Sequence, residues 1–122
     1  MINKFYDLRV WNKSYELILE IYKISNNFPK SEVFSLSNQI RRAAVSVSAN
    51  IAEGFKRNSL REKIHFYSIS LGSLSEVESH LLISRGLIYL NEETFLLLKK
   101  KITEIEALLA ALIRKLRTKI LR

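Results

Sequence analysis

The sequence predicts one all-α domain, an antiparallel four-helix bundle with up-down-up-down topology. Apolar residues recur at helical spacings of three and four over four long segments. Only one proline and three glycines are available to interrupt these segments. The connections between them are short, which makes sequential helices antiparallel. With 122 residues, the chain is long enough for one domain around one hydrophobic core.

The first helix is expected over about residues 8–26. Asp7 is a candidate N-cap, and Pro29 lies just beyond the end. The apolar residues at helical spacing in this segment are Leu8, Trp11, Tyr15, Ile18 and Tyr22. Leu17 and Ile21 lie outside this stripe, so the helix carries more apolar surface than a single face requires.

The second helix is expected over about residues 32–55, with Ser31 as its N-cap. Its apolar stripe comprises Ile40, Ala43, Ala44, Val47, Ile51 and Phe55. A polar stripe and a strip of small residues (Val45, Ala49 and Ala52) also follow helical spacing. A helix patterned on three sides is expected to have neighbours on most of them.

The third helix, over about residues 59–85, begins with a capping box formed by Ser59 and Glu62 and ends at Gly86. Gly72 and several serines in its middle predict close approach of the second helix. The fourth helix, over about residues 92–119, is capped by Asn91. Its heptad pattern runs through Phe95, Leu98, Ile102, Ile105, Leu109, Leu112 and Leu116.

A row of polar residues is predicted to lie inside the bundle, where it must be hydrogen-bonded or paired. We assign a structural polar network to Arg41, Arg42, Ser46, Asn50, Glu53, Glu76 and Glu78. Antiparallel packing places Arg42 at the level of Glu76 and Glu78, where we expect an ion pair. The alternative is a catalytic site built on these carboxylates. A metal-dependent enzyme of this kind would hold a bound metal.

One end of the bundle is predicted to be strongly basic. The start of the first helix, the turn between the second and third helices, and the end of the fourth helix meet there. This basic pole comprises Lys4, Arg9, Lys56, Arg57, Arg61, Lys63, Arg114, Lys115, Arg117, Lys119 and Arg122. The acids nearby are Asp7, Glu53 and Glu62.

The basic pole can account for the whole net charge of +8 and is a candidate surface for the phosphates of RNA or DNA. We predict nucleic-acid contacts from Lys56, Arg57, Arg61, Lys63, Arg114, Lys115, Arg117 and Lys119. Phe5, Tyr6 and Phe55 are placed to add base stacking. The alternative is a solvated end that only keeps the protein soluble.

The sequence offers no support for catalysis. Glu62 and His65 form a single Glu-x-x-His unit, whereas a di-iron bundle needs two such units and two further glutamates. Nucleophile-elbow, phosphate-loop and dinucleotide-binding motifs are absent from the sequence. We therefore expect no enzyme activity, no metal and no cofactor.

The chain contains no cysteine, no apolar run long enough to span a membrane and no secretory h-region, so we expect a soluble cytoplasmic protein. Apolar residues spill beyond one stripe in several helices, as at Leu96, Leu97, Leu108 and Ile113. Self-association is the simplest explanation, and a large core in a monomer is the alternative.

The segments Gln39–Ser46 (QIRRAAVS) and Asn50–Gly54 (NIAEG) resemble a known family, the bacterial four-helix bundle proteins encoded by intervening sequences in 23S rRNA genes. Asp7–Leu8, Val10–Trp11 and Leu71–Glu76 agree with it. The resemblance covers nearly the whole chain. It implies a homopentamer, kinship with the nucleic-acid-binding accessory protein of diversity-generating retroelements, and no assigned enzymatic activity.

The resulting hypothesis is a non-enzymatic oligomer that binds RNA or other nucleic acid through its basic pole. The alternative is a protein-interaction scaffold whose partner is a protein and whose charge serves solubility. Salt dependence separates the two, because phosphate binding weakens steeply as salt rises.

Overall fold

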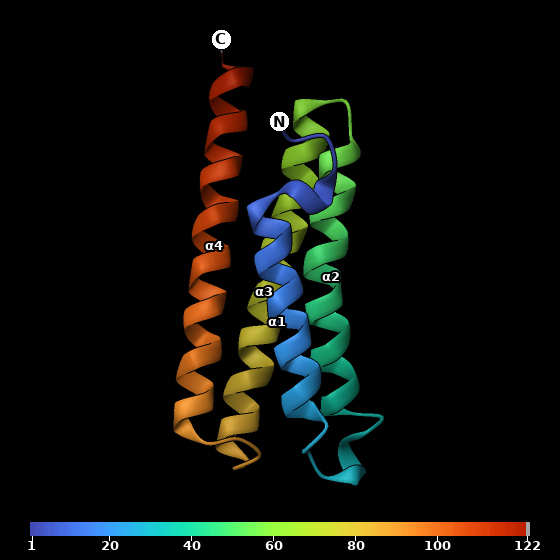
Figure 1. Ribbon diagram of the computed structural model, residues 1–122, viewed down its shortest axis with the longest axis vertical. Coiled ribbons are helices and arrows are strands. Elements are labelled where there is room, and N and C mark those ends of the chain that lie inside the picture. The colour runs from blue at the N-terminus through green and yellow to red at the C-terminus, as the bar shows by residue number, and fades with distance from the viewer. Residues whose placement is uncertain (122) are drawn as a thin grey trace.

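The four helices of the computed structural model, which describes residues 1–121, form an antiparallel bundle (Figure 1). The elements in chain order are the 3-10 turn η1 (Phe5–Asp7), α1 (Arg9–Ser25), the 3-10 turn η2 (Lys30–Glu32), α2 (Leu36–Lys56), α3 (Leu60–Gly86) and α4 (Glu92–Ile120). Helices α1 and α3 each pack against both α2 and α4, so the bundle is square in section. The predicted fold class is confirmed.

One end of the bundle holds the N-terminal segment, the turn between α2 and α3, and the last turns of α4 (Figure 1). The other end holds the α1–α2 connection and the α3–α4 turn (Figure 1). The three chain segments that supply the basic pole therefore meet at one end of the molecule.

Helix α1 begins without the predicted cap. Its N-cap is Leu8, which has no capping side-chain hydrogen bond. The carboxylate of Asp7 turns back to η1 instead, where Oδ2 accepts hydrogen bonds from the backbone N–H groups of Asn3 (3.4 Å) and Lys4 (3.2 Å). Asp7 therefore stabilises the turn that precedes the helix.

Helix α2 begins at Leu36, about four residues later than predicted, and Ser31 is not its cap. The reason is the side chain of Glu32, which accepts one hydrogen bond from the distant Tyr89 and one from the first residue of the helix. Its Oε2 accepts a hydrogen bond from the hydroxyl of Tyr89 (2.7 Å), and its Oε1 accepts one from the backbone N–H of Leu36 (3.4 Å). Residues 30–32 are thereby held as a 3-10 turn against the α3–α4 connection.

The predicted caps of α3 and α4 are confirmed. Ser59 Oγ accepts a hydrogen bond from the backbone N–H of Glu62 (3.2 Å), and Asn91 Oδ1 accepts one from that of Thr94 (2.8 Å). These bonds satisfy N–H groups that have no partner within a helix.

Helix α3 ends at Gly86, as predicted, but Gly86 is not the left-handed residue that follows the helix. Ile88 takes that position, with φ of 62° and an 87% exposed side chain. The backbone N–H of Tyr89 donates to the carbonyl of Ser84 (2.9 Å), and that of Ile88 donates to Arg85 (3.0 Å). This pair of bonds is a Schellman motif, which usually has glycine where Ile88 stands. Tyr89, anchored on Glu32, fixes where the helix ends.

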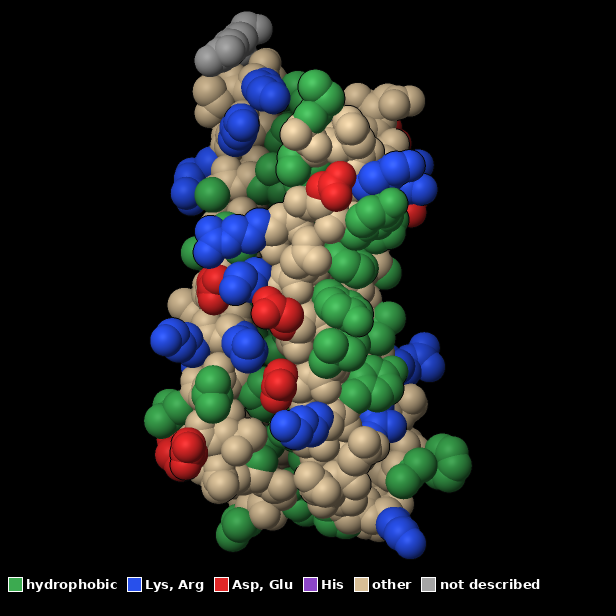
Figure 2. All heavy atoms as spheres, in the orientation of Figure 1, with side chains coloured by type: hydrophobic (Ala, Val, Ile, Leu, Met, Phe, Trp, Pro, Cys, Tyr) green, Lys and Arg blue, Asp and Glu red, His purple; other side chains and the backbone are tan. Residues whose placement is uncertain are grey.

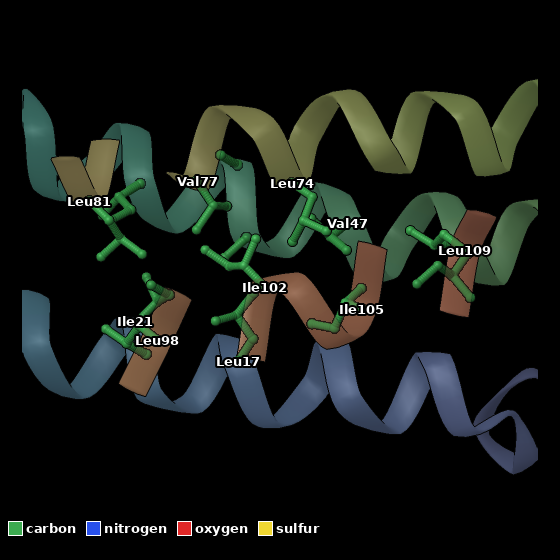
Figure 3. Close-up of a cluster of buried hydrophobic side chains, with 14 of the residues drawn as sticks. Leu17, Ile21, Val47, Leu74, Val77, Leu81, Leu98, Ile102, Ile105 and Leu109 are labelled. Carbon is green, nitrogen blue, oxygen red and sulfur yellow. The ribbon is translucent and has the colours of Figure 1, made fainter. Parts of the chain in front are cut away.

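The core is mainly aliphatic and comes from all four helices (Figure 3). The predicted stripes of α2 and α4 are buried, except that Phe55 and Leu112 are half-buried and Ile113 takes a core position. In α1 the stripe that the periodicity favoured is not the core face. Leu17 and Ile21 are fully buried and point towards Leu98 and Ile102 of α4 (Figure 3), whereas the aromatic residues lie at or near the surface.

Helices α2 and α3 pack closely, as the small residues predicted, but Gly72 is not the residue that permits it. A Cβ added at Gly54 of α2 would lie 2.7 Å from Cε1 of Tyr67, whereas one added at Gly72 would meet no other atom within 4 Å in residues 1–121. Further along, Ser70 Oγ donates to the carbonyl of Val47 (2.7 Å). The contact at Gly54 therefore limits the distance between the two helices.

Replacing Gly54 with alanine is expected to destabilise the protein by about 1–2 kcal/mol, because overpacking against the Tyr67 ring outweighs the gain in helix propensity. The matched control is Gly72→Ala, which adds the same methyl group in open space and should stabilise α3 by up to about 1 kcal/mol. Urea unfolding of both variants measures the two effects. Equal changes in the two variants would contradict the close contact at Gly54.

Tyr67 gives the protein a specific sensitivity to alkaline pH. Burial raises the pKa of Tyr67 from 10.0 to about 12. Between pH 10 and 12 the unfolded chain loses this proton first, so the free energy of unfolding should fall by up to about 1.4 kcal/mol per pH unit. Well below pH 10, Tyr67 is protonated in both the folded and the unfolded chain and does not make the free energy of unfolding depend on pH. Tyr67→Phe should lose less stability than the wild type between pH 9 and 11, as measured by urea unfolding, and identical losses would contradict this assignment.

Candidate nucleic-acid interface

The basic pole is built from the end of α2, the start of α3 and the end of α4. Figure 2 shows Lys and Arg side chains gathered over the upper end of α4. Six of the eight predicted nucleic-acid contacts form no ion pair within residues 1–121 and are exposed to solvent: Lys56, Arg61, Arg114, Lys115, Arg117 and Lys119. These six are the cations most available to an anionic ligand.

Arg57 and Lys63 are partly engaged in holding the α2–α3 turn. The guanidinium of Arg57 pairs with Glu53 and lies 4.8 Å from the ring centre of Phe66. Lys63 Nζ donates to the carbonyls of Phe55 (2.7 Å) and Gly54 (3.3 Å), and burial lowers the pKa of Lys63. A cation at the carbonyl end of a helix is favourable, so Lys63 stabilises the turn that presents the pole.

A hollow of about 310 Å³ lies between the start of α3 and the end of α4, with Arg61 and Arg117 among its lining residues. Its remaining lining is apolar: Ile64, Ile120 and Leu121. Two predicted nucleic-acid contacts, 56 positions apart in the chain, thus border the same hollow. Guanidinium groups beside apolar surface suit a phosphate next to a base or sugar.

The positive charge of Arg9 is partly neutralised by an ion pair. Its Nη2 lies 3.5 Å from Oε1 of Glu104, which also pairs with Lys13 at 3.3 Å. Arg122, which was also predicted to belong to the pole, lies outside the described residues. The strongest concentration of unpaired charge therefore comes from the α2–α3 turn and the last turns of α4.

The polar residues of α2 do not form one network with the acids of α3. Ser46 and Ser73 lie within hydrogen-bonding distance (2.8 Å between hydroxyls), and Asn50 Nδ2 donates to the carbonyl of Ser46 (2.8 Å). Glu53 pairs within its own helix with Arg57. These contacts are local, and they join α2 to α3 through a serine pair rather than through charges.

The predicted ion pair of Arg42 with Glu76 or Glu78 is absent from residues 1–121. Glu78 pairs with Lys99 of α4 instead (2.6 Å), and the hydrogen bond from Lys99 to this carboxylate raises the pKa of Lys99. Arg42 and Glu76 are both exposed and line the same shallow hollow between α2 and α3 without pairing. Removing Arg42 therefore leaves no buried carboxylate unpaired.

Arg41 is held by contacts that sequence reasoning did not find. Its Nε donates to Ser25 Oγ (2.7 Å), its Nη2 donates to Asn26 Oδ1 (2.8 Å), and its guanidinium lies 4.8 Å from the ring centre of Tyr22. Arg41 thus ties α2 to the end of α1. The sequence did contain one signal for these contacts, because the polar residues Ser25 and Asn26 lie together at the predicted end of the first helix.

A second hollow, of about 530 Å³, lies beside Arg41 between the end of α1 and the start of α2. Its lining residues are Tyr22, Asn38, Arg41, Arg42, Val45 and Ser46. The sequence analysis singled out neither Tyr22 nor Asn38 as a site residue, since Tyr22 was counted with the apolar stripe of α1.

Neither a metal-binding cluster nor a membrane-spanning helix is found in residues 1–121. No group of three or more His, Asp or Glu side chains is placed to hold a metal ion in this part of the chain. None of its helices is both long enough and apolar enough to cross a bilayer.

Comparison with known proteins identifies the family. The family model described as 23S rRNA-intervening sequence protein matches residues 6–111, which is most of the chain. The chain belongs to the 23S rRNA-intervening sequence protein family. The resemblance carried by the QIRRAAVS and NIAEG segments is thereby confirmed at the level of the family.

A solved structure shares the architecture of this family member. It is the crystal structure of a protein of unknown function from the S23 ribosomal protein family of Bacteroides thetaiotaomicron. The two proteins are 31% identical, with a TM-score of 0.77 over 85% of this chain and 97% of the other. No curated protein sequence matches the chain.

The two neighbouring arginines of this family member should differ in their effect on stability. Arg41→Ala is expected to cost about 1–2 kcal/mol, because it removes two charged hydrogen bonds and the stacking on Tyr22. Arg42→Ala should change stability by no more than about 0.5 kcal/mol, since the residue is exposed and unpaired in residues 1–121. Thermal or urea unfolding of the two variants measures the difference, and a larger loss in Arg42→Ala would restore the buried-pair interpretation.

Proposed function

We propose that this protein is a non-enzymatic, oligomeric bundle that binds RNA or other nucleic acid through its basic pole. One observation carries the proposal. Six exposed cations without an ion-pair partner in residues 1–121 converge from three helices, and two of them, Arg61 and Arg117, border one hollow. The family takes its name from the intervening sequence of 23S rRNA, so RNA is the first ligand to test.

Binding of this kind depends on charge and shape. Each phosphate neutralised by Lys or Arg releases condensed counterions, so the affinity falls as salt rises. The cations of the pole come from helix ends and a turn, where they can follow a phosphate backbone but present no base-reading motif. We therefore expect tight binding at low salt with little preference for base sequence.

Self-association is part of the proposal. Several large apolar side chains are exposed in the single chain, among them Leu19, Leu82, Ile83, Leu96 and Leu97. Burying them between copies would remove apolar surface from water. In a closed ring such as the pentamer implied by the family resemblance, basic poles on one rim would bind a polyanion with increased avidity.

The same exposed apolar residues favour a second candidate, an interaction scaffold whose partner is another protein. Its binding would depend on apolar contact, and neither salt nor the charges of the pole would control it strongly. The two candidates therefore differ in their response to salt and to charge reversal.

Charge reversal at Arg114, Arg117 and Lys119 should abolish binding of labelled RNA at physiological salt and leave the helical content unchanged. All three side chains are exposed and unpaired in residues 1–121, so their loss should cost phosphate contacts and not the fold. The measurement is RNA and DNA binding across a salt series, with light scattering in the same buffers against the chain mass of 14.2 kDa.

The matched control reverses Lys23, Lys30 and Lys100, which are also exposed but lie outside the pole. This variant has the same net charge as the first and should keep most of its affinity. Equal losses in both variants would show that overall charge carries the binding. Unchanged affinity after reversal of the pole, or no binding at low salt, would leave the protein scaffold as the better explanation.

A further inference from the structure

The face shared by α1 and α2 carries an aromatic stripe, of which Trp11 packs partly against the core and Tyr15 and Tyr22 are exposed. Trp11, Tyr15 and Tyr22 follow helical spacing along α1, and Tyr15 and Tyr22 are 46% and 41% exposed. Figure 2 shows hydrophobic side chains as a continuous band along this part of the molecule. Val45 of α2 is also exposed and lines the hollow beside Tyr22.

The upper part of this stripe is already organised as a stack of rings. The rings of Trp11 and Tyr15 are nearly parallel, with centroids 5.5 Å apart and planes 8° apart. Phe5 packs edge-on against Trp11 at 5.3 Å, and Lys56 Nζ lies 6.0 Å from the ring centre of Phe5. The stack is therefore continuous with the basic pole. Rings held in place by their neighbours lose little entropy when another ring stacks on them.

The lower part of the stripe ends at the hollow that holds Arg41 and Arg42. Arg41 is fixed by Ser25 and Asn26 and lies over Tyr22, so its remaining donors have a defined position. Arg42 is exposed and has no ion-pair partner in residues 1–121. No Asp or Glu lines this hollow of about 530 Å³. Glu76 lines a different hollow with Arg42 but does not pair with it. Two guanidinium groups in a hollow that no carboxylate lines favour an anion.

The acids of α1 lie on a different side of the helix. Glu16 pairs with Lys13 at 3.7 Å, and Lys13 also pairs with Glu104 of α4. Glu20 lines a separate hollow between α1 and α4. The carboxylates of α1 therefore face α4, and the face towards α2 keeps its aromatic and cationic groups free of opposing charge.

From this geometry we infer that the α1–α2 face is a track for single-stranded nucleic acid, an inference that rests on the proposed function. Bases stack on Tyr15 and Tyr22, and a backbone phosphate binds beside Arg41 and Arg42. Tyr22 lies eleven positions after Trp11, about 16 Å at the rise of an α-helix, which accommodates about four nucleotides. A duplex keeps its base faces stacked inside, so only an unpaired strand can use these rings.

A second copy of the chain is the competing occupant, and charge disfavours a two-fold contact through this face. In a closed ring the neighbouring copy would present a different face, and the light-scattering measurement tests that case. In a two-fold contact through this surface, Arg41 and Arg42 of one copy would approach the same residues of the other. No carboxylate lines the hollow to offset the repulsion. A nucleic-acid strand supplies both the ring faces and the negative charge that the surface lacks.

The test compares a labelled U12 RNA with a 12-base-pair RNA duplex, using the full chain and the double variant Tyr15→Ala/Tyr22→Ala. The variant should lose at least tenfold in affinity for U12 and less than twofold for the duplex, which only the basic pole binds. The control is Phe34→Ala, which removes a 95% exposed aromatic ring from the α1–α2 connection, off the track, and should bind U12 like the wild type. Trp11 is the only tryptophan, so its fluorescence should be quenched by U12.

The outcomes separate this inference from the proposed function. Wild-type U12 affinity in the tyrosine variant, or unchanged Trp11 fluorescence on binding, would overturn the track and leave the basic pole standing. Loss of binding together with a fall in mass by light scattering would show that the face joins copies of the chain, and would also overturn it. If neither U12 nor the duplex binds at low salt, the proposed function and the track both fail.

Discussion

Between Gly54 of α2 and the ring of Tyr67 of α3 there is no room for a methyl group, so the bare glycine is what allows the two helices to approach this closely. The bond from Ser70 to the Val47 carbonyl and the Ser46–Ser73 pair continue the close packing towards the other end. Because this approach occurs beside the α2–α3 turn, the end of α2 and the start of α3 present their cations on one small area. Helix α4 packs against α3 and adds its last turns to the same area.

The charge of that area follows from how the acids are distributed along α4. Its acidic residues all precede Ala107, and the four cations of its last turns all follow Ile113. Glu104 pairs with Arg9 and Lys13 from α1, so its carboxylate does not neutralise the cations of the final turns. Cations at a helix C-terminus are favoured by the helix dipole. The pole can therefore stay unneutralised without a large cost in stability, and it is available to phosphates.

Periodicity predicted the helices because each carries strong apolar repeats, and it predicted the cores of α2 and α4 because one stripe in each is clearly the more apolar. Contacts between helices were harder to predict. The sequence contains three glycines, and only packing shows that Gly54 is the tight one and Gly72 is not. In the same way, Glu78 pairs with Lys99 because α4 lies beside α3. Residue spacing along one helix does not show which residue of the neighbouring helix lies opposite.

Helix α1 is where sequence pattern and structure disagree most, and the disagreement bears on function. Periodicity favoured the stripe that contains Tyr15 and Tyr22, but the aliphatic pair Leu17 and Ile21 outside that stripe fills the core and leaves the two tyrosines on the surface. Exposed rings contribute little to a buried core, and local rules tend to fail at functional sites. Charges at the pole bind any phosphate backbone, whereas rings on this face distinguish unpaired from paired bases. Together they would give the bundle a preference for single strands without a base-reading motif.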